Sequence, residues 1–329
     1  MAYRRLALVL LAAVAFVAAA PAAQAQTGGG GTMPGMGGST STTTQYLNNL
    51  QNAQNAPESP NCDSAVSFLD SSVPQTQVRL IFDANYDDRR STRNEYLFPK
   101  SGTPGSPGWW TPEPRVDWQE LKSYVEVAFL SQMSAFFALP TRWVNPDVNP
   151  NDWGVGDLQI GLKYAFVETG GLSLTGQLRG TIPMRSGPGL TTDHYSVEPA
   201  FLFYLRPIAW MAVEGQLKYW VPLCGTEFSG QLVDYGVGVS FLERSYTDFW
   251  FTPVIELEAW TMIDGKEMVV FPDGLGATHN TGGDTICNAV GGVRFGFGDN
   301  GDIYVGVGHS LTGDAWQHYF WRLEFRVRF

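Results

Sequence analysis

The last residues of the chain, HYFWRLEFRVRF, alternate between two kinds of side chain with a period of two. Apolar residues, most of them aromatic, take every second position from Tyr319 to Phe329, and most residues between them are charged. Side chains on a β-strand point alternately to its two faces. Such a strand needs an apolar environment on one face and a polar one on the other, which restricts the chain to few folds.

The same alternation recurs from about residue 76. In LQIGLKYAF, for example, Leu158, Ile160, Leu162, Tyr164 and Phe166 share one face. The pattern predicts strands near residues 76–87, 119–130, 133–143, 155–167, 171–183, 194–205, 210–222, 232–242, 248–262, 285–297, 302–311 and 317–329. Most exceed the ~5–6 residues typical of strands in soluble proteins and suit a tilted membrane crossing of ~9–11 residues.

Short and long connections alternate between these segments. The long ones are 88–118, 144–154, 184–193, 223–231, 263–284 and, least clearly, 312–316. Outer-membrane barrels have short periplasmic turns and long extracellular loops, and only a closed barrel satisfies all backbone groups of membrane-spanning strands. We therefore predict an all-β, transmembrane, antiparallel up-and-down β-barrel of about 12 strands, with both termini in the periplasm. A soluble sandwich rarely sustains such long strands with so many outward aromatics.

Composition agrees with a β-protein that meets lipid. Charged residues make up 16% of the chain, below the ~25% of ordinary soluble domains, while aromatics reach 13%. No stretch after residue 25 is apolar over the ~18 residues that a transmembrane helix needs. The formal net charge of −11 argues against nucleic acid as a partner.

The N-terminus has the features of a secretory signal peptide, predicted over residues 1–25. Arg4 and Arg5 precede an apolar stretch, and Ala23-Gln24-Ala25 forms a small-x-small cleavage site. A secretory signal peptide followed by a β-barrel predicts that the protein is located in the outer membrane of a bacterium with two membranes.

Residues 26–75 are predicted to be a low-complexity periplasmic leader that precedes the barrel, residues 76–329. Much of the leader is rich in Gly, Ser, Thr, Asn and Gln, and such a segment cannot bury enough apolar surface to fold alone. Phe68 and Leu69 are the residues that could dock it on the barrel.

Neither cysteine nor histidine spacing indicates a metal or cofactor site. Cys62, Cys224 and Cys287 lie far apart without C-x-x-C spacing, so either Cys224 and Cys287 form one disulfide or all three are small fillers. The histidines are scattered, and we predict no metal, cofactor or catalytic residue. Acidic residues predominate in the outer loops, where they form a solvated rim or hold divalent cations.

Charged side chains on the polar strand faces should point into the barrel. They either pair across strands and stabilise a narrow interior, or line a permeation path whose charges set selectivity; both can hold. Twelve strands lie between the filled eight-stranded barrels and the 16-stranded porins. The candidate pore-lining residues are Glu126, Arg142, Asp157, Lys163, Arg179, Glu198, Glu214, Lys218, Asp234, Glu256, Glu258, Arg294, Arg322, Glu324 and Arg326.

A catalytic alternative rests on His194, Ser196 and Glu198, which share a strand face and resemble the His-x-Ser of outer-membrane phospholipases. Tyr195 and Val197 take the opposite, lipid-facing positions. The three polar residues therefore point into the lumen, where a lipid ester does not reach, and we do not predict an enzyme.

Three stretches, GVGDLQIGLKYAF (154–166), VEPAFLFYL (197–205) and LKYWVPLCGTEFSGQLVDYGVGVSF (217–241), resemble the outer-membrane barrels named after the MetA pathway of phenol degradation. The resemblance implies a channel or transporter and transfers no catalytic residues. We expect passive passage of small solutes, among them small aromatic or hydrophobic compounds. The alternatives are a structural or adhesive barrel with a closed lumen and, less favoured, a lipid-modifying enzyme.

The C-terminal strand also resembles the signal by which outer-membrane barrels are recognised for assembly, which implies the assembly machinery and outer-membrane lipid as partners. The residues of this signal are Tyr319, Trp321, Leu323, Phe325, Val327 and Phe329.

Deleting Phe329, or changing it to Asp, should therefore lower the amount of assembled protein in the outer membrane more than Arg328→Ala does. The first changes remove the terminal outward aromatic, whereas the second alters the polar face. Quantitative blotting of membrane fractions measures this. Normal membrane levels of both Phe329 variants would contradict an assembly signal.

Overall fold

The computed structural model describes residues 64–88, 109, 111, 113–184, 186–187, 189–224, 228–241, 249–270, 276–298, 300–313 and 315–329. The predicted signal peptide, the leader up to residue 63 and Cys62 lie outside these residues. No helix in the described part of the chain is long and apolar enough to cross a membrane.

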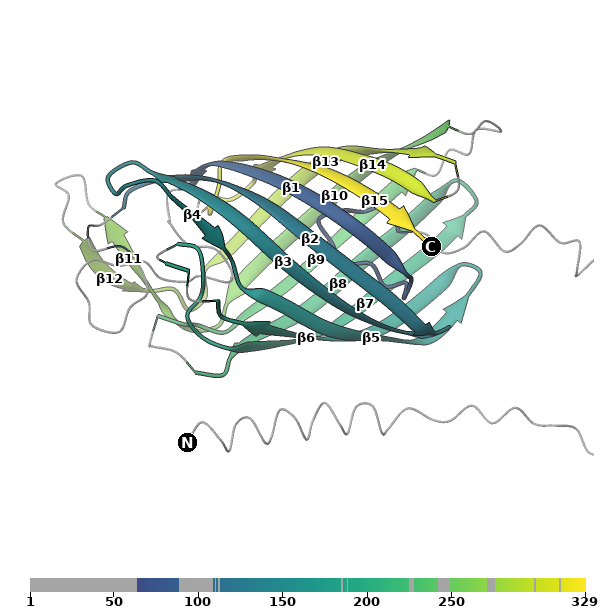
Figure 1. Ribbon diagram of the computed structural model, residues 1–329, viewed down its shortest axis with the longest axis horizontal. Coiled ribbons are helices and arrows are strands. Elements are labelled where there is room, and N and C mark those ends of the chain that lie inside the picture. The colour runs from purple at the N-terminus through teal and green to yellow at the C-terminus, as the bar shows by residue number, and fades with distance from the viewer. Residues whose placement is uncertain are drawn as a thin grey trace, which may run out of the picture.

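The described chain forms a closed, antiparallel β-barrel of twelve strands whose tilted strands are visible in Figure 1. Consecutive barrel strands pair with each other, and β1 pairs with β15 to close the ring. The barrel strands are β1 (Gln77–Asp88), β2 (Val116–Leu130), β3 (Met133–Pro146), β5 (Leu158–Thr169), β6 (Leu172–Ile182), β7 (Ser196–Ile208), β8 (Met211–Pro222), β9 (Leu232–Phe241), β10 (Phe249–Met262), β13 (Thr285–Phe297), β14 (Gly301–Ser310) and β15 (Tyr319–Arg328).

The predicted fold class is confirmed, and each predicted strand has a counterpart. Two features are additional. The short strand β4 (Asp152–Val155) pairs with β3 in line with β5, and β11 (Lys266–Val270) pairs with β12 (Gly276–Asn280) as a separate hairpin. Sequence alternation missed these strands because they are too short to show a periodic pattern, and their pairing rests on backbone hydrogen bonds.

The closing pair of strands shows how the two faces of the wall divide. Asp83 lies opposite Arg322 and Leu80 opposite Phe325 in the register of β1 and β15. Leu323 and Phe325 are exposed on the outside, whereas Glu324 between them is fully buried. Among the other residues of the predicted assembly signal, Tyr319, Trp321 and Phe329 are also exposed, and Val327 is half-buried. The terminal strand therefore turns its apolar side chains to the outside.

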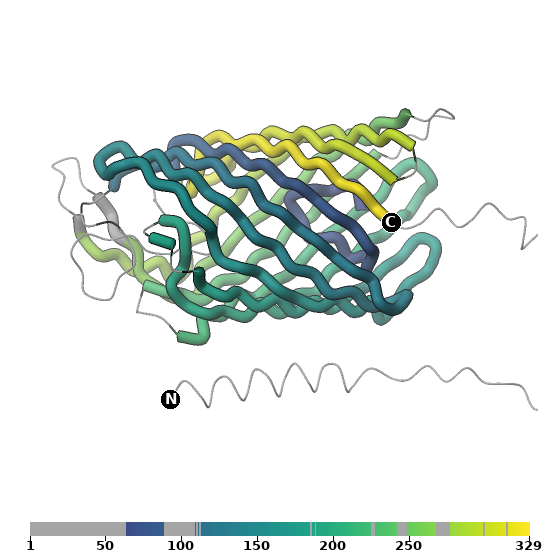
Figure 2. The backbone as a smooth tube through the Cα atoms, in the orientation of Figure 1, coloured from purple at the N-terminus to yellow at the C-terminus, as the bar shows by residue number. Residues whose placement is uncertain are grey.

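A chain segment before β1 lies inside the barrel. We call residues 64–76 the luminal segment. Figure 2 shows it in purple inside the barrel, at the end of the barrel where the C-terminus lies. The sequence analysis assigned nearly all of it to the periplasmic leader. It occupies the half of the barrel that carries the short turns, because its partners Glu214 and Arg294 lie near the turns that precede β8 and follow β13.

Two glycines of β9 make room for the luminal segment. A Cβ atom built on Gly236 would lie 2.6 Å from Leu69 Cδ2, and one on Gly238 would lie 2.5 Å from Val66 Cγ1. Both distances are shorter than real Cβ contacts allow. The glycines in VDYGVGVSF therefore let the segment approach the strand backbone closely.

The closed barrel predicts heat-modifiable migration. The mature protein in detergent should run faster on a denaturing gel when unheated than when boiled, because a closed ladder of backbone hydrogen bonds keeps the barrel compact. Identical migration of both samples, with recovery of the protein in the soluble periplasm, would contradict a membrane-embedded barrel.

Candidate permeation path

Two glutamates of the wall bind the backbone amides of the luminal segment. Glu256 accepts hydrogen bonds from the N–H groups of residues 67–69 at 2.9–3.2 Å. Glu214 accepts from those of Ala65 and Val66 at 3.0 and 3.4 Å. The segment has no regular secondary structure, so these side chains satisfy amides that would otherwise be buried without partners.

Three arginines satisfy the carbonyl groups of the same segment. Arg294, Arg322 and Arg326 donate hydrogen bonds to the backbone oxygens of residues 64–67 at 2.5–3.0 Å. The wall thus presents acceptors to the amides and donors to the carbonyls.

Asp70 adds a charged contact at the far end of the segment. Its carboxylate lies 2.5 Å from an Arg179 nitrogen and 3.5 Å from Lys218 Nζ, and its backbone N–H donates to Gln216 at 2.8 Å. Burial raises the pKa of Asp70, but the nearby positive charges of Arg179 and Lys218 outweigh burial and hold it well below its usual value. Asp70 is therefore ionised at neutral pH.

Most of the candidate pore-lining residues on the strands form ion pairs with one another and with other wall residues, whereas Glu214, Glu256 and Glu258 accept hydrogen bonds. Arg294 bridges Asp302 and Glu324 at 2.5 and 2.9 Å, and Glu324 also pairs with Arg79. Arg322 binds Asp83 across the closing strands at 2.6 Å. All of the candidates are buried except Arg179 and Arg322, which are mostly buried.

Some partners were absent from the candidate list. Asp302 pairs with Arg326 at 2.8 Å, and Glu120 pairs with Arg142. Their positions on the inward face of β14 and β2 were available from strand alternation. Asp70 had no such signal, because it lies outside any strand.

Asp157 has a different setting from the other candidates. It lies between β4 and β5 and accepts hydrogen bonds from the backbone and hydroxyl of Thr192 at 2.8 and 2.6 Å. Met184 N also donates to it, at 3.3 Å. Asp157 therefore anchors the loop between β6 and β7, and burial raises its pKa.

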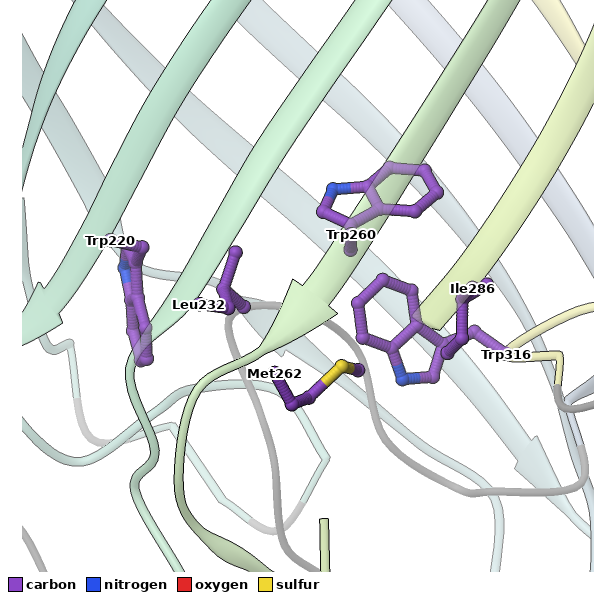
Figure 3. Packing of buried hydrophobic residues seen from close by; sticks show 6 residues of the cluster. All are labelled: Trp220, Leu232, Trp260, Met262, Ile286 and Trp316. Atoms are coloured by element: carbon purple, nitrogen blue, oxygen red, sulfur yellow. The ribbon is translucent and has the colours of Figure 1, made fainter. Parts of the chain in front are cut away.

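A cavity of about 150 Å³ borders the luminal segment at Ser67, Phe68 and Asp70 and extends towards the long-loop end of the barrel. Trp260 and Trp316 line it and pack edge to face, with ring centroids 5.1 Å apart; Figure 3 shows them within an apolar cluster at the ends of β8, β9, β10 and β13. The lining also contains aromatic and charged residues, among them Trp118, Tyr124, Phe320, Arg79, Asp83, Lys122, Glu258 and Arg322. The lumen therefore has a filled half and a partly open half.

The His194, Ser196 and Glu198 group is not arranged as a nucleophile and base. His194 Nδ1 lies 2.6 Å from the Thr192 carbonyl oxygen, and Ser196 Oγ has no hydrogen-bond partner among the described residues. Glu198 instead lies 3.2 Å from Arg179. Cys224 and Cys287 are both free thiols, so the disulfide alternative is wrong.

No family profile and no curated protein matches the sequence. The fold is similar to the COG4313 outer membrane channel from Pseudomonas putida F1, with a TM-score of 0.53 and 13% identity over 81% of this chain and 99% of that one. The chain has the fold of an outer-membrane β-barrel. A weaker likeness is to a NanC porin, with a TM-score of 0.44 and 8% identity over 77% of this chain and 100% of that one. Another is to the KdgM porin in complex with disordered oligogalacturonate, with a TM-score of 0.43 and 8% identity over 76% of this chain and 99% of that one.

Removing the acid of the luminal segment should destabilise the barrel. Asp70→Ala leaves the positive charges of Arg179 and Lys218 less neutralised in a mostly buried site. We expect the free energy of unfolding to fall by about 2–3 kcal/mol. The measurement is the urea midpoint of unfolding in detergent. The matched control is Arg115→Ala, which removes an ion pair with Asp147 at 3.0 Å whose side chains are 49% and 41% exposed. Equal shifts in both variants would contradict a stabilising role for Asp70.

Proposed function

We propose that this barrel is a channel through which small solutes pass passively, and that the luminal segment forms its constriction. The observation that carries the proposal is the cavity between that segment and the long-loop end of the barrel. The first and last barrel strands place Gln77 opposite Arg328 at the end with the short turns. We take this end as periplasmic, so both barrel termini face the periplasm and the cavity faces outward.

The contacts of the luminal segment favour a constriction that can move, and not a permanently filled interior. Over residues 64–72 its backbone is held by side chains of the wall, chiefly Glu214, Glu256 and Arg294, and not by pairing with a strand. Side-chain hydrogen bonds of this kind can be exchanged for water when the segment moves. A strand inserted in the ladder would lack this freedom.

The lining of the cavity supports small aromatic or hydrophobic compounds as solutes. Trp260, Trp316 and Phe320 offer apolar ring faces, which stack against flat apolar groups. Arg322 and Lys122 lie on the same lining and would orient a polar or anionic substituent. We also propose that the chain is a distant relative of the MetA-pathway barrels, on the strength of the three stretches described above.

The proposed role is the binding and passage of solutes, without catalysis. Its support is that Ser196 Oγ makes no hydrogen bond to His194, since a serine nucleophile needs a base within hydrogen-bond reach. The second candidate function is a structural barrel with a closed lumen. It is favoured by the dense pairing of the luminal segment with Glu256 and the wall arginines.

Planar-bilayer conductance decides between these functions. Deleting residues 65–72 should raise the single-channel conductance several-fold over the wild type, because water and ions replace the segment. Leu323→Ala, on the exposed outer face, is the control and should leave conductance unchanged. Absence of conductance in both the wild type and the deletion variant, each shown to be folded by heat-modifiable migration, would favour the closed barrel.

A disulfide between the luminal segment and the barrel wall tests whether the segment moves, without removing it. The Thr175 hydroxyl donates to the Ser72 carbonyl, so Ser72→Cys with Thr175→Cys, in a chain whose native cysteines are replaced by Ser, can form a disulfide. Oxidation should lower conductance if the segment moves and reduction should restore it. Equal conductance in both states would show that solutes pass beside a fixed segment.

A further inference from the structure

Three side chains with metal-binding chemistry converge outside the lumen, at the long-loop end of the barrel. Glu267, His279 and Asp284 each present one ligand atom, and these atoms all lie within 4.8 Å of one another. Glu267 is buried, Asp284 is half-buried and His279 is exposed. The cluster is therefore formed partly below the surface and remains accessible to ions from solution.

The β11–β12 hairpin explains why two of these residues meet. Glu267 lies directly opposite His279 in the antiparallel register. Directly opposite residues point to the same face of a two-stranded sheet, with Cβ atoms about 4.5–5.5 Å apart. A carboxylate and an imidazole are therefore held side by side by backbone pairing, although twelve positions separate them in the sequence.

Backbone hydrogen bonds fix the third residue at the base of this hairpin. Asp284 N donates to the Thr281 carbonyl at 3.0 Å, and the Asp284 carbonyl accepts from Met262 N at 3.0 Å. Met262 ends β10, and Asp284 directly precedes β13. Asp284 therefore belongs to the barrel rim, whereas Glu267 and His279 belong to the hairpin that projects beyond that rim (Figure 1).

We propose that Glu267, His279 and Asp284 bind a divalent transition-metal ion of the Zn²⁺ class, which fastens the β11–β12 hairpin to the rim of the barrel. One imidazole and two carboxylates are a donor set suited to Zn²⁺, and three protein ligands leave a coordination position for water. The two carboxylates neutralise the charge of the ion. Ca²⁺ and Mg²⁺ prefer all-oxygen sites, so the histidine favours the transition metals.

The geometry needs only a small adjustment to accept the ion. Zinc ligands lie at about 2.0–2.2 Å from the metal, and thus about 3.4 Å from one another in a tetrahedral site. Donor atoms that are now within 4.8 Å of one another must therefore approach by at most about 1.4 Å. His279 is exposed, and its ring can rotate inward without displacing core residues. The bound ion would then set the position of the hairpin relative to the outer opening of the barrel.

Zinc titration of the purified barrel in detergent, after removal of metals with EDTA, tests the site. We expect one strongly bound Zn²⁺ per chain by calorimetry, and a loss of affinity of at least about tenfold in His279→Ala and Asp284→Asn, since even changes behind a ligand cost that much. His309→Ala and Cys224→Ser are the matched controls, because they remove another histidine and an exposed thiol. These two variants should keep the wild-type affinity.

A second measurement reports on the hairpin itself. Zn²⁺ should slow tryptic cleavage after Lys266 in the wild type and not in His279→Ala, with fragments followed by mass spectrometry. Unchanged heat-modifiable migration of each variant shows that the barrel is intact. The proposal is overturned if the wild type binds no stoichiometric Zn²⁺, if affinity survives both His279→Ala and Asp284→Asn, or if Zn²⁺ leaves cleavage unchanged in the wild type.

Discussion

Satisfaction of buried polar groups is the constraint on which the rest of this structure depends. In the wall it is met by the closed ladder of backbone hydrogen bonds, because β1 pairs with β15 and leaves no free edge. In the lumen it is met by ion pairs and by the luminal segment. Glu256 and Arg294 are buried charges whose hydrogen-bonding capacity is used largely by the backbone of that segment. Removing the segment would leave Glu256 without its backbone donors, and removing the charges would leave backbone groups of the segment without acceptors and donors.

This arrangement divides the interior into two halves with different physical properties. Near the short turns, charges of both signs are neutralised in a dense network around Glu324. Towards the long loops, Trp260 and Trp316 face a space that charged side chains also line. In the proposed channel, selection of solutes and restriction of flow would then lie at different depths. In the filled half, Gly236 and Gly238 of β9 make room for the apolar side chains of Leu69 and Val66.

The long-loop end shows how residues that look unrelated in the sequence become neighbours. The histidines appeared scattered, and no spacing in the sequence joined His279 with Glu267 and Asp284. The hairpin of β11 and β12 joins the first two through its register, and the return of the chain to β13 adds the third. Side-chain alternation predicts the faces of long strands, but it carries little information about short strands in loops.

The sequence by itself determined the fold class, the long barrel strands and the division of their faces. Each long strand must satisfy its own alternation, and a shift of one residue would turn every side chain to the wrong side. This is why Arg322 could be assigned inward before its contact with Asp83 was known. Only the tertiary structure decided what occupies the lumen. The residues around Asp70 have no periodic pattern, and their position depends on Arg179, Lys218 and Gln216, which are separated from Asp70 by more than a hundred residues and meet it only when the barrel closes.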